Sequence, residues 1–130
     1  MSGADYARAN NAWAACTGHL RRAFEQIDVL ACPAMPDLPF PVTPEGQRSS
    51  SPVVDETSYR LQRFTVPFDF NGAPTLTLPC GKSSEGLPLS LQLAGKPLGE
   101  PLLCPLGAAY EAATEWHNLH PPPAGLGQTP

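Results

Sequence analysis

The chain has 130 residues, with 8 basic and 12 acidic side chains and a net charge of −4. A chain of this length builds one domain rather than two. Because the charge is mildly negative and no cluster of lysine or arginine occurs, we expect no nucleic-acid partner. No apolar run approaches the roughly 20 residues that a membrane helix needs, so we expect no membrane partner either.

The four cysteines are spread along the chain, and no CxxC pair occurs among them. Small secreted domains that depend on disulfides are denser in cysteine than this. We therefore expect four reduced, mostly buried thiols in a cytoplasmic protein. The four residues are Cys16, Cys32, Cys80 and Cys104.

Residues 3–26 are predicted to form an amphipathic helix. Ser2 and Asp5 have the spacing of a capping box at its start. Gly18 weakens the middle of this helix by about 1 kcal/mol relative to alanine. Mostly apolar residues recur at steps of three, four and seven, which places them on one helical face. The residues of that face are Tyr6, Trp13, Thr17, Leu20, Phe24 and Ile27.

The apolar run at residues 27–32 ends at Pro33 and predicts a short strand buried on both faces. Proline recurs between residues 33 and 44, and proline neither donates to a strand ladder nor continues a helix. This segment is therefore predicted to be an extended loop. Its PxxP spacing also occurs in ligands of SH3-like domains, but no basic residue flanks it, so we favour the structural interpretation. Residues 45–56 are polar and predicted to be mobile.

The second half of the chain predicts a helix followed by two strands. Residues 57–71 can form a helix that is interrupted or tightened near Pro67 and stopped by Gly72. Residues 75–80 predict a strand, and residues 81–86 predict a turn.

Leucine then alternates with other residues from Leu87 to Ala94, which is the clearest strand pattern in the chain. Its all-leucine face requires a cover. Residues 102–116 predict a last helix, in which Pro105 and Gly107 are unfavourable.

In this order the segments resemble the C-terminal part of the amidase signature family. The resemblance covers residues 4–123, and we expect residues 1–123 to form a partial amidase-like domain and residues 124–130 a disordered tail. Four motifs carry the resemblance. They are Asp28-Val29-Leu30 leading to Pro33-Ala34-Met35-Pro36, Phe64-Thr65-Val66-Pro67-Phe68, Asn71-Gly72-Ala73-Pro74, and Gly86-Leu87-Pro88-Leu89-Ser90-Leu91-Gln92-Leu93.

The resemblance implies an α/β fold with a small mixed sheet of two to four strands, flanked by about three helices. It also implies hydrolysis of carboxylic amides in the complete family member, through a serine nucleophile, a second serine in a cis peptide and a lysine. No cofactor is implied. The Gly/Ser-rich core that carries those residues is absent from this sequence, and the lysines Lys82 and Lys96 come too late in the chain. No catalytic residue can be assigned, and we expect the chain alone to be inactive.

One position can be transferred from the family, the loop after the strand at residues 27–32, which borders the substrate pocket in family members. The resemblance implies that this loop forms one wall of an acyl pocket. The alternative, that it only covers a core, stays open. The candidate substrate-binding residues are Cys32, Ala34, Met35 and Leu38.

Two other groups of residues have an ordinary interpretation. Lys82, Ser83 and Ser84 place a base beside two hydroxyls, but a turn rarely holds a nucleophile rigidly, so we interpret them as a solvated turn. His117 and His120 could face the same way on a helix. A metal site usually needs three or four ligands, so we expect a frayed helix end and no metal.

Two classes of function follow. The chain is either the C-terminal segment of an amidase-family hydrolase, or a free-standing binding or assembly module derived from one. The first class predicts an upstream catalytic half, or self-association, as the partner, and a small-molecule amide as substrate only in the complete enzyme. The first class also predicts an exposed leucine face and poor independent stability. The second predicts a closed core and a soluble monomer or dimer.

Overall fold

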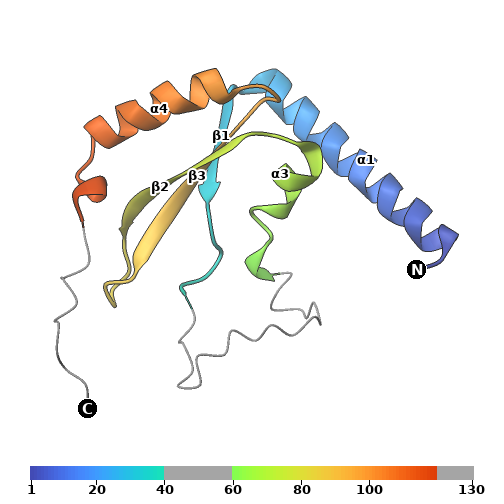
Figure 1. Cartoon of the computed structure of the whole chain (residues 1–130), viewed down its shortest axis with the longest axis horizontal. Helices are drawn as coiled ribbons and strands as arrows, with labels where there is room; N and C mark the ends of the chain where they lie inside the picture. Colours follow the sequence, from blue (N-terminus) through green and yellow to red (C-terminus); the bar gives the residue numbers. More distant parts are fainter. Residues whose placement is uncertain (40–59, 120–130) are drawn as a thin grey trace, which may run out of the picture.

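The computed structural model describes residues 1–39 and 60–119 (Figure 1). The predictions for residues 40–59, His120 and the tail at 124–130 lie outside these residues. The helices and strands of the described part are α1 (Gly3–Gln26), β1 (Val29–Pro33), α3 (Val66–Asn71), β2 (Thr75–Lys82), β3 (Pro88–Gly95), α4 (Glu100–Ala112) and the short 3-10 helix η1 (Trp116–Asn118). Within these ranges, no helix is long and apolar enough to cross a membrane.

The three strands form one sheet in the order β1-β3-β2, so β3 is central. Gln92 of β3 lies opposite Cys32 of β1 and Thr77 of β2. The α/β class, the strand number and the three helices agree with the prediction. Both strand pairs in the described part are antiparallel, so the parallel pairing that a mixed sheet would require does not occur there.

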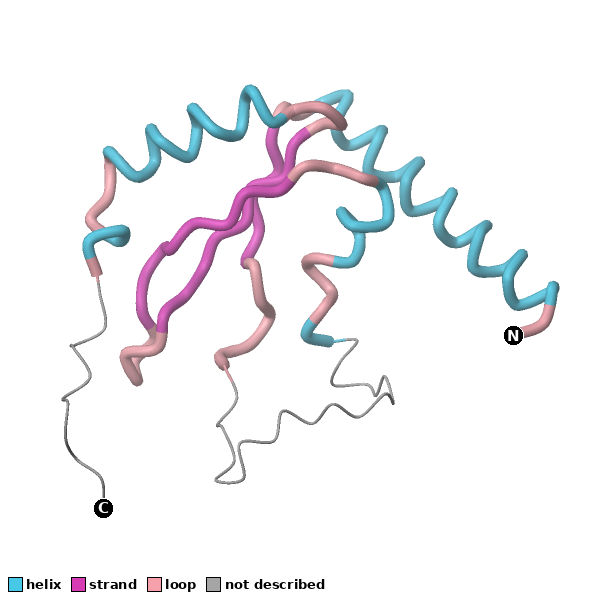
Figure 2. Tube along the Cα trace, in the orientation of Figure 1, coloured by secondary structure: helices cyan, strands magenta, loops and turns pink. Residues whose placement is uncertain are grey.

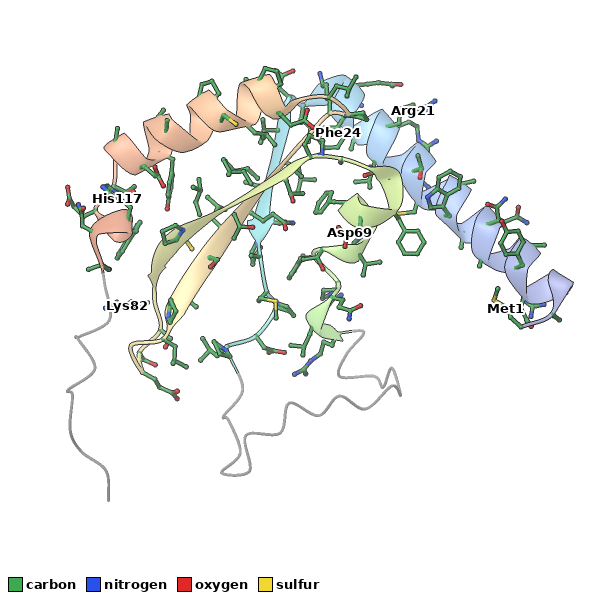
Figure 3. All side chains as sticks on the ribbon, viewed as in Figure 1. Met1, Arg21, Phe24, Asp69, Lys82 and His117 are labelled. Atoms are coloured by element: carbon green, nitrogen blue, oxygen red, sulfur yellow. The ribbon has the colours of Figure 1, made fainter. Side chains whose placement is uncertain are left out.

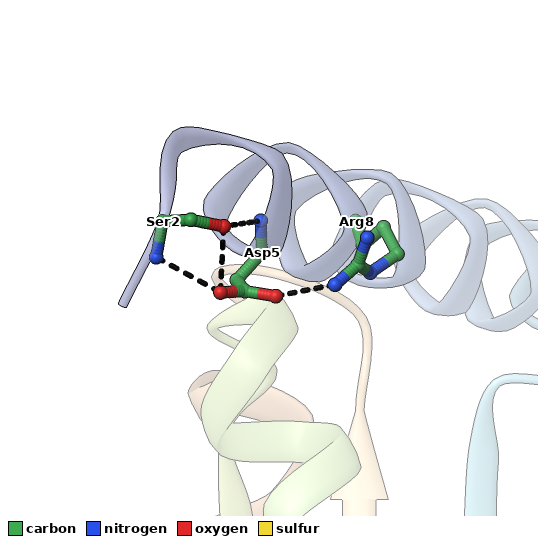
Figure 4. Close-up of polar contacts among 3 residues, drawn as sticks. All are labelled: Ser2, Asp5 and Arg8. Atoms are coloured by element: carbon green, nitrogen blue, oxygen red, sulfur yellow. Dashed lines mark hydrogen bonds and ion pairs between the residues drawn. The ribbon is translucent and has the colours of Figure 1, made fainter.

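The capping box at the start of α1 is confirmed (Figure 4). Ser2 Oγ accepts a hydrogen bond from the Asp5 backbone N–H at 3.1 Å, and Asp5 Oδ2 accepts one from the Ser2 backbone N–H at 2.8 Å. The Ser2 hydroxyl also donates to Asp5 Oδ2 at 2.7 Å. The hydrogen bonds from the Ser2 side chain and backbone lower the pKa of Asp5. Arg8 forms an ion pair with the other carboxylate oxygen.

The sheet lies between α4 on one face and α1 with α3 on the other (Figure 2). Consecutive side chains of a strand point to opposite faces, and β3 shows this at Leu93 and Ala94. Ala94 packs with Phe24 of α1 and Phe68 of α3, whereas Leu93 packs with leucines of β2 and α4. Figure 3 shows Phe24 beside the sheet, at the end of α1 nearest to it. The core therefore consists of two small clusters rather than one.

Only one stretch of the predicted apolar face of α1, from Thr17 to Phe24, is covered, and Ile27 after it is exposed. Phe24 is buried and Leu20 is partly buried against it. Tyr6 and Trp13, on the part of the helix that extends away from the sheet, are 63% and 43% exposed (Figure 1). The described residues therefore leave an aromatic stripe of α1 open.

The prediction that the first strand is buried on both faces is wrong. In β1, Val29 and Leu30 are half-buried, and Ala31 and Pro33 are exposed. The reason is that β1 is an edge strand in the described part of the sheet, because it pairs only with β3. An apolar run alone does not show how many neighbours a strand has.

The helix expected at residues 57–71 is interrupted by a turn, and its main part, α3, begins only at Val66. Arg60 and Leu61 are helical, residues 62–65 form a turn, and α3 then starts with Pro67 in its first turn. Proline is favourable there because the first turn has no partner for its backbone nitrogen. Gly72 ends α3 with φ +69°, which confirms the predicted glycine stop.

The last helix is shorter than predicted, because Trp116 belongs to η1 and not to α4. Pro105 lies inside α4, which continues through it. Gly107 is buried where α4 crosses β2. One helical turn further along α4, the Tyr110 hydroxyl donates to the Pro79 carbonyl of β2 at 3.2 Å. This hydrogen bond is a second contact between α4 and β2.

The expectation of mostly buried thiols is also wrong. All four cysteines are free, but Cys16, Cys32 and Cys80 are half-buried and Cys104 is exposed. Cys104 lies one residue after the buried Leu103 on α4, on a different side of the helix. Their burial depends on which elements cover them, and the sequence spacing does not determine that.

Candidate functional site: a cavity at the end of the first strand

A cavity of about 750 Å³ lies where β1 ends. Three parts of the chain line it: the end of β1 with the loop after it, the neighbouring ends of β2 and β3, and Leu61 from the segment before α3. Its lining is mostly apolar. The lining residues are Ala31, Cys32, Pro33, Met35, Asp37, Leu38, Pro39, Leu61, Cys80, Pro88, Leu89, Ser90 and Leu91.

Local sequence features explain why the chain leaves a space here. β1 stops pairing at Pro33, opposite Leu91, while β3 continues back to Pro88. The Ala34 N–H still donates to the Ser90 carbonyl at 3.0 Å, and beyond that bond the loop leaves the sheet. The loop bends at Ala34, Pro36 and Asp37, and its prolines have no N–H with which to continue the pairing. β3 therefore projects past the end of its neighbour and forms one side of the cavity.

The pairing of β3 with its other neighbour, β2, is irregular near the cavity. The pairing of β2 with β3 shifts by one residue between Pro79 and Gly81, so Cys80 forms a bulge. A bulge redirects the side chains around it and bends the strand. Here the bulge places Cys80 among the lining residues.

Three of the four predicted substrate-binding residues line this cavity, namely Cys32, Met35 and Leu38. Ala34 does not line it and is buried instead. Met35 and Leu38 are partly open to solvent, with Met35 48% exposed. Their position agrees with a pocket wall, and their role stays a prediction.

The lining contains one charged side chain, that of Asp37. Its Oδ2 atom forms an ion pair with Arg60 Nη2 at 2.7 Å. The remaining polar groups are the Ser90 hydroxyl and the thiols of Cys32 and Cys80. Such a lining suits an uncharged hydrocarbon group, which gains free energy when its apolar surface leaves water.

Gln92 was not among the predicted site residues, and the alternating pattern places it on the face of the strand opposite the leucines. Gln92 is only 3% exposed. Its Nε2 atom donates to the Phe64 carbonyl at 2.7 Å and lies 3.6 Å from Cys32 Sγ. The available signal was a large polar side chain in the middle of a strand, directly followed by Leu93 and Ala94. If both faces of the strand are covered, such a side chain must have a hydrogen-bonding partner.

The other polar groups singled out from the sequence do not form a site together. Ser83 Oγ accepts hydrogen bonds from the backbone N–H groups of Glu85 and Leu87, both at 3.2 Å, so this hydroxyl shapes the turn. Lys82 is exposed at the end of β2, and His117 is exposed in η1 (Figure 3). Among residues 1–39 and 60–119, no three potential metal ligands come together.

The protein family described as Amidase matches residues 2–104 of this chain. Among curated proteins, the chain is similar to one subunit of the glutamyl-tRNA(Gln) amidotransferase of Cyanothece sp. (strain PCC 7425 / ATCC 29141). The two are 42% identical over 99 residues, which is 76% of this chain and 19% of the relative. The same subunit from Chloroflexus aurantiacus (strain ATCC 29366 / DSM 635 / J-10-fl) is 38% identical over 116 residues, 89% of this chain and 22% of the relative.

The chain thus spans about a fifth of the length of the curated relatives it matches, and it matches their C-terminal portion. Among solved structures, it resembles 6-aminohexanoate cyclic dimer hydrolase complexed with substrate, with a TM-score of 0.74 and 27% identity. That match covers 93% of this chain and 27% of the hydrolase. It also resembles the corresponding glutamyl-tRNA(Gln) amidotransferase protein of Thermotoga maritima, with a TM-score of 0.53 and 26% identity, over 72% of this chain and 20% of that protein.

Proposed function

The chain belongs to the amidase family, and we propose that it serves as the C-terminal segment of an amide hydrolase of that family. In this role it is not catalytic alone, but completes the fold and supplies one wall of the substrate pocket. The observation that carries the proposal is its match to the C-terminal portion of much longer relatives, combined with a sequence that lacks the Gly/Ser-rich catalytic core. The partner is then an upstream catalytic half.

An open aromatic surface supports such a partner. Tyr6 and Trp13 of α1 and Phe70 of α3 are all exposed, at 63%, 43% and 52%. The Trp13 indole N–H donates to the Phe70 carbonyl, which links the two helices into one surface. Exposed aromatic side chains held in place are typical anchors of protein interfaces. We propose that the upstream half covers this surface.

The sheet edges support the same partner. In the described part, β1 and β2 each pair only with β3, so each has one open edge. An open edge presents unpaired backbone groups that pair readily with a further strand. We propose that strands of the upstream half extend this sheet.

The cavity supports the pocket wall. Met35, Leu38 and Cys32 line it from one side, and its apolar character suits the acyl part of a carboxylic amide. We propose a small-molecule carboxylic amide as the substrate class of the complete enzyme, and a cytoplasmic location for it.

Complementation tests the proposal directly. The upstream part of the Cyanothece amidotransferase relative, ending where the match to this chain begins, is mixed with this chain, and ammonia release is measured with aliphatic amides of increasing acyl length. We expect release only from the mixture. Trp13→Asp and Phe70→Asp should weaken complementation, whereas Ser84→Asp in the exposed turn should leave it unchanged. A complex that forms but stays inactive with every amide would contradict the proposal.

The alternative function is a free-standing binding module, and the two hydrophobic clusters within the chain favour it. Urea unfolding separates the two functions, because Trp13 and Trp116 report opposite ends of the described chain. One steep transition, with a slope of about 1–2 kcal/mol/M, would favour the module. A shallow drift without a baseline would favour the segment of a larger enzyme.

A further inference from the structure

Gln92 is the one polar residue among the described residues that is buried as a whole, with 3% of its surface exposed. It lies on the central strand, on the face of the sheet that α1 and α3 cover. A buried amide costs free energy unless its hydrogen bonds are satisfied, and Gln92 donates to the Phe64 carbonyl at 2.7 Å. This bond joins the sheet to a segment that belongs to no strand.

The segment that Gln92 holds forms part of the cavity. Leu61 lines the cavity, and it lies between two anchored residues of the same segment, Arg60 and Phe64. The Arg60 anchor is an exposed ion pair with Asp37, and such pairs contribute little to stability. The Phe64 anchor is a bond from a buried donor, and its loss would leave that donor unsatisfied. Gln92 is therefore the stronger of the two anchors.

We propose that Gln92 is a positioning residue for the cavity: by holding Phe64 it fixes Leu61 as a wall, and so sets the size of the uncharged hydrocarbon group that the cavity accepts. The nature of the natural ligand, an acyl group, rests on the proposed function. The positioning of the wall does not, because all the residues involved belong to this chain.

Amide hydrogen exchange of the whole chain tests the anchor. The variant Gln92→Met keeps an unbranched side chain and removes the donor. The reporters are the Thr65 and Val66 amides, which donate to the Gln62 carbonyl at 3.0 Å and close the turn. We expect both to exchange about tenfold faster in the variant, while the amides between β2 and β3 change by less than about twofold. An equal acceleration of all amides, or none at Thr65 and Val66, would overturn the proposal.

The matched control is Thr77→Val. Thr77 lies opposite Gln92 on β2 and is exposed, so this change also replaces a polar side chain by an apolar one at the same level of the sheet. It should leave the exchange of the Thr65 and Val66 amides unchanged.

If Gln92→Met does not fold, the wild-type chain provides the test. The side-chain amide protons of Gln92 should then exchange about as slowly as the Thr65 amide, since one opening releases both. Exchange of these protons at the rate of a free amide would refute the anchor.

Alkylation of Cys32 tests the size selection. In a chain with Cys16, Cys80 and Cys104 replaced by serine, Cys32 is the remaining thiol and lines the cavity. The probes are N-methylmaleimide and N-octylmaleimide. We expect the alkylation rate with N-octylmaleimide, relative to that with N-methylmaleimide, to be about tenfold higher in Gln92→Met than in the background with Gln92 intact. The reason is that the wall no longer restricts the larger probe. An unchanged ratio would contradict size selection. This assay needs no catalytic half, so its outcome is independent of the complementation result.

Discussion

The side chain of Leu76 on β2 packs directly against the backbone of Gly107 on α4, so that a β carbon at position 107 would overlap Leu76 Cδ2. Leu78 Cδ1 would lie 3.6 Å from the same β carbon. Glycine lowers helix propensity by about 1 kcal/mol, so its presence here is unfavourable locally. The close crossing of α4 over β2 explains it.

The first prediction compares this glycine with one that has space around it. At Gly18 of α1, the nearest atom to a β carbon is Arg22 Nη1 at 3.8 Å. Gly18→Ala should therefore stabilise the chain by about 1 kcal/mol. Gly107→Ala brings the same propensity gain but displaces Leu76, and overpacking costs about 1–3 kcal/mol. Urea unfolding of both variants should show Gly18→Ala to be more stable than Gly107→Ala. Equal stabilities would contradict the close packing at Gly107.

The second prediction concerns two leucines of α4. Leu103 is 2% exposed and packs between Leu78 and Leu93, whereas Leu106 is exposed. Leu103→Ala leaves a cavity and should cost about 2–5 kcal/mol of unfolding free energy. Leu106→Ala should change the stability of the chain alone by less than about 0.5 kcal/mol. The midpoints of urea unfolding test both, and a large loss at Leu106 would mean that α4 packs through a different face.

Local signals in the sequence correctly predicted the positions of those elements that depend on local chemistry. The capping box of Ser2 and Asp5 and the left-handed Gly72 both appear where they were predicted, because each acts within one helical turn. The alternating leucines likewise identified β3 as a strand. The resemblance supplied the fold class and the loop that lines the cavity.

The sequence failed where burial depends on distant neighbours. Nothing in the run at residues 27–32 shows that β1 is an edge strand of the described sheet. The burial of Gln92 follows from α1 and α3, which cover the face opposite the leucines. Gly107 seemed unfavourable because helix propensity is local, while its contact with Leu76 joins residues that are far apart in the chain.

The third prediction is a dependence on pH at the start of α1. The hydroxyl and the backbone N–H of Ser2 donate to the Asp5 carboxylate and lower its pKa in the folded state. A lowered pKa means that the carboxylate stabilises the folded helix end above the ordinary aspartate pKa, and that this stabilisation is lost as the pH falls through the lowered value. The first turn of α1 should therefore fray progressively as the pH falls from the ordinary aspartate pKa through the lowered one.

An NMR titration of the Asp5 side chain measures this effect. In Ser2→Ala the midpoint should rise toward the ordinary aspartate value, because the strongest hydrogen bond to the carboxylate is gone. In Asp5→Asn the backbone signals of the first turn should not titrate in the pH range in which aspartate is protonated. A midpoint that stays the same in Ser2→Ala would show that the hydroxyl does not hold the carboxylate.

The last prediction concerns Met35, which lines the cavity and is partly exposed. In the complemented enzyme, Met35→Ala removes a flexible apolar side chain from the wall and enlarges the space for the acyl group. We expect kcat/KM for long-chain aliphatic amides to rise relative to short-chain ones by about tenfold, the scale on which an apolar pocket discriminates by size. Leu106→Ala is the control, since it removes a similar exposed side chain from α4, outside the cavity. An unchanged preference in Met35→Ala, with complementation intact, would mean that this loop only covers the core and does not contact the substrate.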